Sequence, residues 1–429
     1  MRHHRGPLPA VSACLTLLVA LAMVSGWLVS VAPLARAAGE VVQGRLVDAE
    51  KEPVAGVEIS VSQDGTEIGT ATSGSDGRWE IPVPGPGTYE VTLDESTLPE
   101  GTGLREGTAG SREVTVDPGA PRNVLFPLGE VTSSGESLGA ALAQRTLDGL
   151  LLGALIGITA IGLSLIFGTT GLINFAHGEL VTTGAVVAFG LNAVGLHVAL
   201  AVLVAVPVVA ALAGGTELLL WRPMRRRRIS RVSMFIATIG LALLLRQAVL
   251  VVYGGDPHTY AEYSLQRTWQ WGPVSITPRD AAILGIALLV LVLVGLALTR
   301  SRLGTAIRSV SDNRALAGCS GIDVDRVVLQ VWVVGGGLAA LGGVLYGLNQ
   351  AVTWNMGFNL LLLMFAGVIL GGLGTAFGAV VGSLVVGLLA QLSTVFFETE
   401  LQTVWALLLL VLVLLVRPQG LLGLRERVG

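Results

Sequence analysis

The sequence predicts a helical membrane protein with several spans, preceded by a small all-β domain on the outer side. Two observations lead to this fold class. The 429-residue chain is 52% hydrophobic and only 13% charged, which is about half the charged fraction of a typical soluble protein. The deficit is uneven, because eighteen of the 30 acidic residues lie between Glu40 and Glu136, whereas apolar runs fill the chain beyond Asp148. The chain is therefore expected to contain two regions that lie in different solvents.

The first residues have the order of an export signal. Arg2 and Arg5 precede the apolar stretch Val11–Val31, and small residues follow at Ala35–Ala37, as signal peptidase sites require. We therefore predict a signal peptide over residues 1–37; the alternative is a first membrane helix that stays attached. In both cases the next segment is delivered to the outside.

Residues 38–129 are expected to form a sandwich of roughly seven strands. Apolar and polar residues alternate with period two, which is typical of half-buried strands, and the dipeptides Asp64-Gly65 and Asp76-Gly77 favour hairpin turns. The segment contains neither histidine nor cysteine and its carboxylates are scattered, so we predict no catalytic or metal-binding group in it. The alternating apolar positions are Val57, Ile59, Val61, Trp79, Ile81, Val83, Tyr89, Val91 and Leu93.

Four short motifs of this domain resemble the carboxypeptidase-regulatory-like or Cna-B-like sandwich family. The resemblance implies a stalk or interaction module without catalysis, whose acidic surface keeps it soluble; docking toward a binding protein is the alternative. Residues 130–146 are expected to form a linker, and residues 147–429 the transmembrane permease domain. The motifs are Gly44–Asp48, Pro53–Val57, Gly77–Trp79 and Gly87–Tyr89.

Nine apolar stretches are candidates for membrane spans, each of which needs about 20 predominantly apolar residues. Several are short, so seven spans is the alternative. The stretches are Leu150–Phe167, Leu180–Asn192, Val198–Gly214, Met234–Val252, Ala281–Leu298, Val328–Leu348, Leu360–Gly372, Phe377–Phe396 and Val404–Val416.

Arginine clusters at 222–231, 300–314 and 417–427 predict the orientation, since the positive-inside rule places all three in the cytoplasm. The loop 254–280 is then outside. An exported β-domain and a cytoplasmic C-terminus require an odd number of spans. The protein is thus expected in the cell membrane as a multi-pass protein, in contact with lipid and without nucleic-acid binding.

Lysine occurs once, at Lys51. A phosphate-binding loop of the GxxxxGK[ST] type needs a lysine that reaches the phosphates of a nucleotide, and the membrane portion has none. The chain is therefore not expected to hydrolyse ATP by that route, and ATP-driven transport would need a separate ATPase. We predict no enzyme activity, no cofactor and no metal site.

The stretch Phe167–Leu180 is unusual for a membrane segment, because glycines interrupt its apolar run and polar side chains enter it. Irregular backbone in a bilayer is tolerated where protein buries it or where it lines a cavity, and ionisable groups there mark a pathway or a structural pair. We expect a substrate pathway; the alternative is a short cytoplasmic loop with a helix start at Asn174. The candidate pathway residues are Gly168, Gly171, Asn174, Phe175, His177, Gly178 and Glu179.

Two further features of the membrane portion bear on the pathway. The glycine-interrupted regions around Gly168 and Gly374 fall in opposite halves, which indicates an internal repeat around a substrate path. Arg246 lies within the fourth expected span and either pairs with a carboxylate or reaches outward.

The stretch around His177 resembles the signature of the branched-chain amino acid ABC transporter permease family. The resemblance covers residues 147–429, and the β-domain is an addition to the usual family pattern. It implies partners: a second homologous permease subunit, two cytoplasmic ATPase subunits and an extracytoplasmic solute-binding protein. The matching segments are Leu163–Gly168, Gly171–Glu179, Arg222–Met224, Ile236–Leu241, Gly371–Thr375, Gly378–Gly382 and Arg417–Leu421.

The polar loop Arg300–Arg326 resembles the segment by which such permeases dock into their ATPase. A short amphipathic helix there is suited to transmit ATPase closure as a rigid-body push; an ordinary solvated loop is the alternative. The candidate coupling residues are Gly304, Arg308, Asp312, Asn313 and Gly321.

The sequence thus predicts the permease subunit of an ABC importer for branched-chain or related amino acids. A permease for urea or short amides is one alternative, because a close branch of the family carries these solutes. A membrane-anchored display or sensor protein, with the β-domain as its working part, explains the many spans poorly. A self-sufficient secondary transporter leaves the coupling-like loop without a partner.

Overall fold

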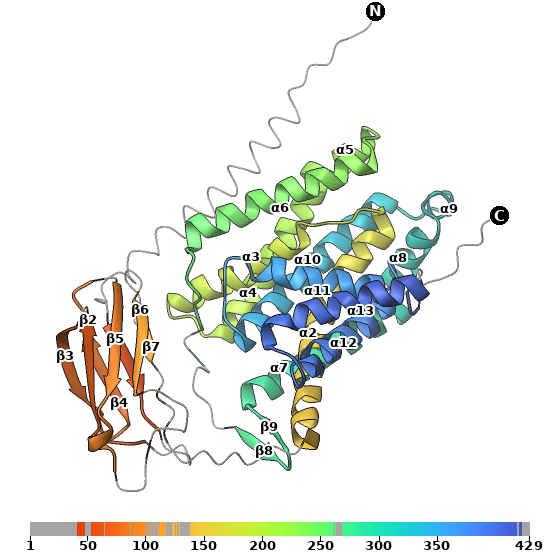
Figure 1. The fold of residues 1–429 in the computed structure, drawn as a ribbon. Coiled ribbons are helices and arrows are strands. Elements are labelled where there is room, and N and C mark those ends of the chain that lie inside the picture. The colour runs from red at the N-terminus through yellow and green to blue at the C-terminus, as the bar shows by residue number, and fades with distance from the viewer. Residues whose placement is uncertain are drawn as a thin grey trace, which may run out of the picture. The chain divides into compact units, whose positions relative to one another are not determined.

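The computed structural model divides into a β-unit and a helical unit (Figure 1). The structure describes residues 41–47, 53–63, 65–85, 87–99, 103, 110–116, 122–124, 126, 128, 138–260, 262, 268–417 and 420–422. The predicted signal peptide, residues 1–37, lies outside these residues, and so does the first part of the predicted linker.

The β-unit contains seven strands in two sheets, in the orders β4-β1-β7 and β3-β2-β5-β6. All nine alternating apolar positions are buried in one core that both sheets share, so the prediction of an all-β sandwich is confirmed. One pair, β1 with β7, is parallel. The elements are β1 (Val41–Arg45), β2 (Glu58–Gln63), β3 (Thr66–Thr72), β4 (Arg78–Pro82), β5 (Gly87–Leu93), the short helix η2 (Glu95–Thr97), β6 (Ser111–Val116) and β7 (Arg122–Val124).

Each of the nine predicted spans overlaps a helix of the helical unit. Within the described part of the chain, six helices are long and apolar enough to cross a membrane: α2, the continuous helix Val198–Arg226, α6, α7, α10 and α12. A helical protein with many spans is therefore confirmed, and the count of nine stays a prediction. The elements are α2 (Leu138–Thr170), α3 (His177–Ala193), α4 (Val198–Thr216), the π-helix η3 (Glu217–Trp221), α5 (Arg222–Arg226), α6 (Arg231–Tyr253), β8 (Trp269–Trp271), β9 (Val274–Ile276), α7 (Pro278–Arg300), α8 (Arg302–Asp312), α9 (Arg314–Cys319), α10 (Val324–Asn349), α11 (Met356–Gly371), α12 (Ala376–Ser393), η4 (Thr399–Leu401) and α13 (Gln402–Val416).

Helix α2 begins at Leu138, inside the segment 130–146 that the sequence analysis assigned to a linker. Residues 138–146 include leucine, three alanines, glutamine and arginine, all of which have high helix propensity. The helix therefore extends by two and a half turns beyond its apolar run.

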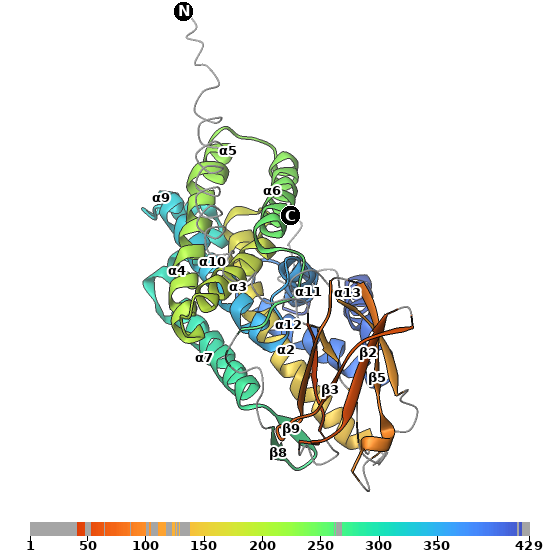
Figure 2. The same ribbon diagram turned by 90° about the vertical axis from the view of Figure 1, so that its left-hand side faces the viewer.

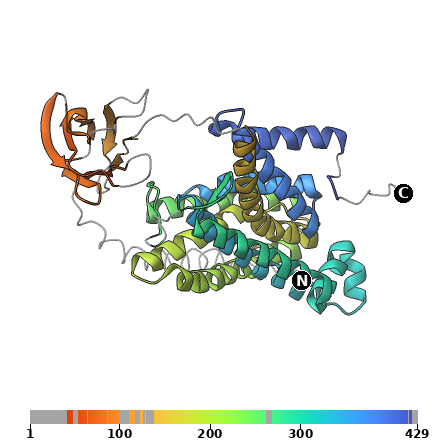
Figure 3. The same ribbon diagram turned by 90° about the horizontal axis from the view of Figure 1, so that it is seen from below.

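Helix α2 lies at the centre of the helical unit, among α10, α11 and α12 (Figures 1 and 3). In the most apolar 18-residue stretch of α2, 89% is buried. Glycines allow this close packing, as small residues do between membrane helices. A Cβ atom on Gly387 of α12 would lie 2.3 Å from the backbone nitrogen of Gly153 in α2, and one on Gly162 would lie 2.8 Å from the carbonyl oxygen of Gly335 in α10.

Helices α6 and α7 are peripheral, because only 17% of the most apolar 18-residue stretch of each is buried. In Figures 1 and 2, α6 lies at the edge of the unit. Their uncovered faces are apolar, with Ile236 and Val251 among the exposed side chains of α6. Such faces suit lipid or another membrane subunit, since neither contact requires polar groups.

Replacing Gly387 with alanine is expected to destabilise the helical unit by about 1–3 kcal/mol, because backbone atoms of α2 occupy the space of the added methyl group. The measurement is the thermal unfolding midpoint of the detergent-solubilised protein. Gly285→Ala in α7 is the matched control, because no atom lies within 4 Å of its added Cβ. Equal midpoints for the two variants would contradict this account of the α2–α12 contact.

Candidate substrate pathway and coupling segment

The chain between α2 and α3 turns back into the helical unit. Helix α2 ends at Thr170, Gly171 adopts a φ of +67°, and α3 begins at His177. Nε2 of His177 lies 3.1 Å from the carbonyl oxygen of Thr159, which is about 16 Å back along α2 at 1.5 Å per residue. Helix α3 thus begins deep in the helical unit, against the middle of α2.

The three polar candidates of this stretch are all buried, with at most 1% of their surface exposed, but they face different neighbours. The side-chain oxygen of Asn174 accepts a hydrogen bond from the backbone of Ala176 at 3.1 Å and so forms the turn before α3. His177 faces α2, whereas Glu179 faces α6. Nδ1 of His177 and Oε2 of Glu179 have no hydrogen-bond partner among the residues that the structure describes.

Glu179 forms an ion pair with Arg246 of α6. Its Oε1 accepts hydrogen bonds from Nε and Nη2 of Arg246, both at 3.1 Å, and the guanidinium lies 3.8 Å from the ring centroid of Phe358 in α11. The sequence left open whether Arg246 pairs with a carboxylate, and the structure shows that it does. The signal that could have found this residue is an arginine within an otherwise apolar span.

Four half-buried phenylalanines lie on α6, on α11 and directly before α3, and one of them, Phe358, contacts the pair. The ring of Phe175 is 5.5 Å from that of Phe235 and 5.0 Å from that of Phe365, and Phe358 contacts Arg246. We call Phe175, Phe235, Phe358 and Phe365 the aromatic strip. Of these, the sequence analysis had singled out Phe175 alone, because apolar side chains within apolar helices give no separate signal.

The glycines of the candidate pathway sit at close contacts between helices. A Cβ on Gly178 would lie 2.6 Å from the carbonyl oxygen of Gly357 at the start of α11. One on Gly168 would lie 3.0 Å from the carbonyl oxygen of Gly374 and 2.8 Å from Oγ of Ser311 in α8. The two glycine-interrupted regions of the sequence therefore lie side by side, and α8 touches the same point.

The candidate coupling loop folds into α8 and α9. Gly304 allows α8 to pack on the end of α7, because a Cβ there would lie 2.2 Å from the carbonyl oxygen of Leu298. The side chain of Asn313 accepts a hydrogen bond from the backbone nitrogen of Leu316 at 3.0 Å and caps α9. Gly321, with a φ of +86°, ends α9. Arg308 and Asp312 are exposed.

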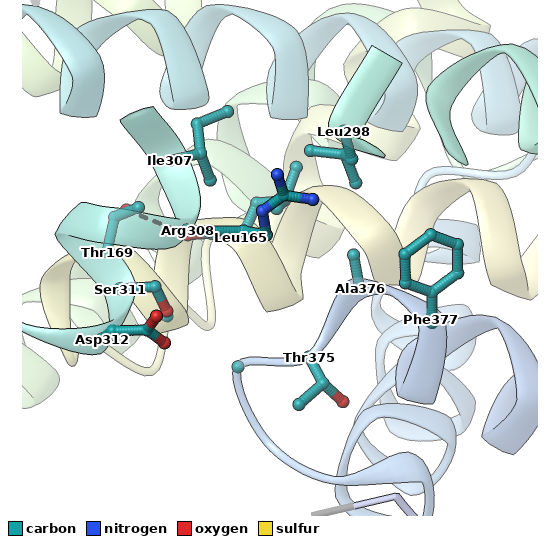
Figure 4. Close-up of a pocket in the computed structure, with 12 residues that line it drawn as sticks. Leu165, Thr169, Leu298, Ile307, Arg308, Ser311, Asp312, Thr375, Ala376 and Phe377 are labelled. Atoms are coloured by element: carbon teal, nitrogen blue, oxygen red, sulfur yellow. Dashed lines mark hydrogen bonds between the residues drawn. The ribbon is translucent and has the colours of Figure 1, made fainter. Parts of the chain in front are cut away.

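A pocket of about 200 Å³ separates α8 from the end of α2 and the start of α12. Figure 4 shows Arg308, Ser311 and Asp312 on the α8 side and Thr375, Ala376 and Phe377 on the opposite side. The remaining lining residues are Leu165, Gly168, Thr169, Leu298, Ile307 and Gly374. The coupling segment and the glycine-interrupted region thus share one cavity.

Asp325 joins three of the arginines whose clusters predict the orientation of the chain. It lies 3.0 Å from Nε of Arg222, 2.9 Å from Nη2 of Arg226 and 3.7 Å from Nη2 of Arg314. These bonds connect α5, α9 and the first turn of α10, so the cluster also organises the region next to the coupling segment.

A second buried ion pair lies in the π-helix η3. Both oxygens of the fully buried Glu217 are bonded to the guanidinium of Arg225. Glu217 begins η3, and π-turns within α-helices are frequent at functional sites. Here the π-turn directs a carboxylate toward the arginine cluster.

Comparison with known proteins identifies both units. Residues 145–416 match the family model of the branched-chain amino acid transport system permease component, and residues 41–129 match the carboxypeptidase regulatory-like domain. The high-affinity branched-chain amino acid transport system permease proteins LivH of Salmonella typhimurium and BraD of Pseudomonas aeruginosa are each 31% identical to the chain. In both cases the match covers 66% of this chain and 96% of the relative.

A more distant relative is the ribose import permease protein RbsC of Escherichia coli K12, which is 29% identical over 54% of this chain and 72% of its own length. Fold and site together define a multi-pass membrane transport permease rather than an enzyme. The chain belongs to the family of branched-chain amino acid ABC transport permeases. Both resemblances found in the sequence are confirmed, and such a permease functions within an ABC transporter complex.

Replacing Asp325 with asparagine is expected to lower the thermal midpoint, because Arg222, Arg226 and Arg314 lose their shared counter-charge. The loss is about 1 kcal/mol, since these groups are partly exposed to solvent. The measurement compares midpoints at low and at high salt, where screening weakens exposed charge pairs. A difference from wild type that does not shrink in high salt would contradict this electrostatic role.

Proposed function

We propose that the chain is the permease subunit that carries branched-chain or related amino acids across the cell membrane. Its partners in this proposal are a second homologous permease subunit, two cytoplasmic ATPase subunits and an extracytoplasmic solute-binding protein. The observation that carries the proposal is the match to amino acid permeases over 96% of their length. The match to a ribose permease covers a smaller share of that relative. It therefore supports a sugar substrate less strongly than the other matches support an amino acid.

The substrate pathway in this proposal passes the start of α3. It includes Gly168, Gly171, Asn174, Phe175, His177, Gly178 and Glu179. The depth of His177 along α2 supports it, because an irregular backbone there requires either protein cover or an aqueous path. Within this set, His177 positions α3 against α2, while Phe175 and Glu179 face α6.

Coupling to the ATPase runs through α8 and α9 in this proposal. Arg308, Asp312 and Asn313 are exposed and available to a partner, whereas Ser311 on the same helix touches Gly168 at the end of α2. A rigid displacement of α8 would therefore reach the pathway through one contact and one shared pocket. Interfaces of this kind transmit small shifts because packed elements move as bodies.

The proposed orientation places α5, α8 and α9 in the cytoplasm and the β-unit outside. The arginine clusters support it through the positive-inside rule. The hairpin β8–β9, whose Trp269 and Trp271 are exposed, would then lie at the outer membrane interface, where tryptophan is enriched.

Replacing Arg308 with alanine is expected to abolish amino acid uptake while leaving the amount of protein in the membrane unchanged, because an exposed arginine contributes to docking rather than folding. For Asn313 the alanine variant should lose uptake and the serine variant should retain most of it, since serine also caps a helix. The measurement is uptake of radiolabelled leucine by cells that express each variant. Normal uptake by Arg308→Ala would remove the coupling assignment.

The partners are tested by purifying the tagged chain from native membranes in a mild detergent and identifying the proteins that accompany it by mass spectrometry. We expect a homologous permease subunit and the two cytoplasmic ATPase subunits, together with a solute-binding protein. Recovery of the chain alone, under conditions where a known importer stays assembled, would favour a secondary transporter or a display protein instead.

A further inference from the structure

We propose that the Glu179–Arg246 pair binds the ammonium and carboxylate groups of the transported amino acid, and that Phe358, the member of the aromatic strip that contacts Arg246, receives the apolar side chain. This assignment rests on the proposed function and specifies the chemistry of its site. It adds Arg246 and Phe358 to the pathway.

The two buried ion pairs of the helical unit differ in how completely their carboxylates are hydrogen-bonded. Among the ion pairs of the described residues, two have a carboxylate that is fully buried: Glu217–Arg225 and Glu179–Arg246. Both oxygens of Glu217 are bonded to Arg225. In Glu179 only Oε1 is bonded, and Oε2 is buried without a partner.

A buried carboxylate oxygen without a hydrogen bond is costly, and native structures retain few such groups without a functional reason. Glu217 has the bonding expected of a structural pair. Glu179 instead has one acceptor unused, and Arg246 uses Nε and Nη2 for the pair, which leaves further donors of its guanidinium for another group. One free acceptor and free donors at the same place match a ligand with one positive and one negative end.

The proposed solute, an amino acid, carries a positive and a negative charge at the same time. An amino acid zwitterion that enters the membrane loses the hydration of both charges, and that loss is large unless each charge meets an opposite one. The unused Oε2 of Glu179 would accept an N–H of the ammonium group, and Arg246 would donate to the carboxylate. A neutral solute such as urea has no comparable need for a buried pair of opposite charges.

The ion pair has an apolar neighbour on α11. Phe358 lies 3.8 Å from the guanidinium of Arg246 and is half-buried, so it offers apolar surface next to the charged groups. Phe235 and Phe365 lie farther along α6 and α11, where Phe175 contacts both rings. Leucine, isoleucine and valine have that same combination of an apolar side chain beside a charged main chain.

Access of a substrate to the pair requires a displacement of α6. This helix is peripheral, and polar bonds attach it along its length: Thr238 with Ile173 at 3.3 Å, Arg246 with Glu179, and Tyr253 with the carbonyl oxygen of Val352 at 2.9 Å. The side chain of Arg246 is 13% exposed and that of Glu179 is fully buried, so a substrate would meet Arg246 first, from the α6 side.

The test replaces both charges together, as Glu179→Gln with Arg246→Met, and measures leucine uptake in cells where this variant substitutes for the native chain. Removing both charges of a buried pair is often neutral for stability, so a structural pair would tolerate the change. If the pair binds substrate, uptake falls on the order of tenfold or more at normal membrane levels. The matched control is Glu217→Gln with Arg225→Met, which is expected to retain uptake.

Wild-type uptake by the Glu179→Gln, Arg246→Met variant would overturn the assignment. If that variant does not reach the membrane, the exchanged pair Glu179→Arg with Arg246→Glu decides, because it keeps an ion pair but reverses the charges beside the aromatic strip. Lost uptake at normal membrane levels supports the proposal, and normal uptake overturns it. Failure of the proposed function is a separate result, because then cells with the native chain would take up no amino acid through this complex.

Discussion

Close approach of helix backbones at glycine is the constraint on which the helical unit depends. Apolar side chains gain little by leaving lipid for another helix, so membrane helices associate through tight packing. Gly153 and Gly387 bring α2 onto α12, Gly162 and Gly335 bring it onto α10, and in each pair the missing side chains let main-chain atoms touch. Gly178 with Gly357 continues the same principle into the site, where it fixes the starts of α3 and α11 against each other.

Burial of charge is the second constraint, and it separates structural pairs from functional ones. The membrane portion keeps few carboxylates, and the two that are fully buried each face an arginine. Glu217 and Arg225 satisfy one another and lie beside the Asp325 cluster, near the coupling segment. Glu179 and Arg246 connect a helix of the packed centre to the peripheral α6. The same pairing thus joins two turns of one helix in one place and two separate helices in the other.

Much of this architecture could be predicted from the sequence, since apolar runs and period-two alternation are local signals. The polar residues of the Phe167–Leu180 stretch were likewise visible as exceptions within an apolar run. Which helix each one faces could not be predicted, because facing depends on tertiary packing: Arg246 has no local feature that selects Glu179. The contact of Gly168 with Gly374 joins positions some two hundred residues apart. The first turns of α2, from Leu138, carry no hydrophobic signal, because helix propensity continues there beyond the apolar run.

The π-turn at Glu217–Trp221 has a consequence for how the length of this helix can change. A π-turn contains one residue more than an α-turn over the same hydrogen-bonded stretch. Deleting a single residue there would restore a regular α-helix and leave the residues after it close to their present phase. Arg222, Arg225 and Arg226 would then keep facing Asp325 and Glu217. A deletion in a regular part of the same helix would instead rotate everything after it by about 100°, so the π-turn is the place where this helix can lose one residue with the least disturbance of α5.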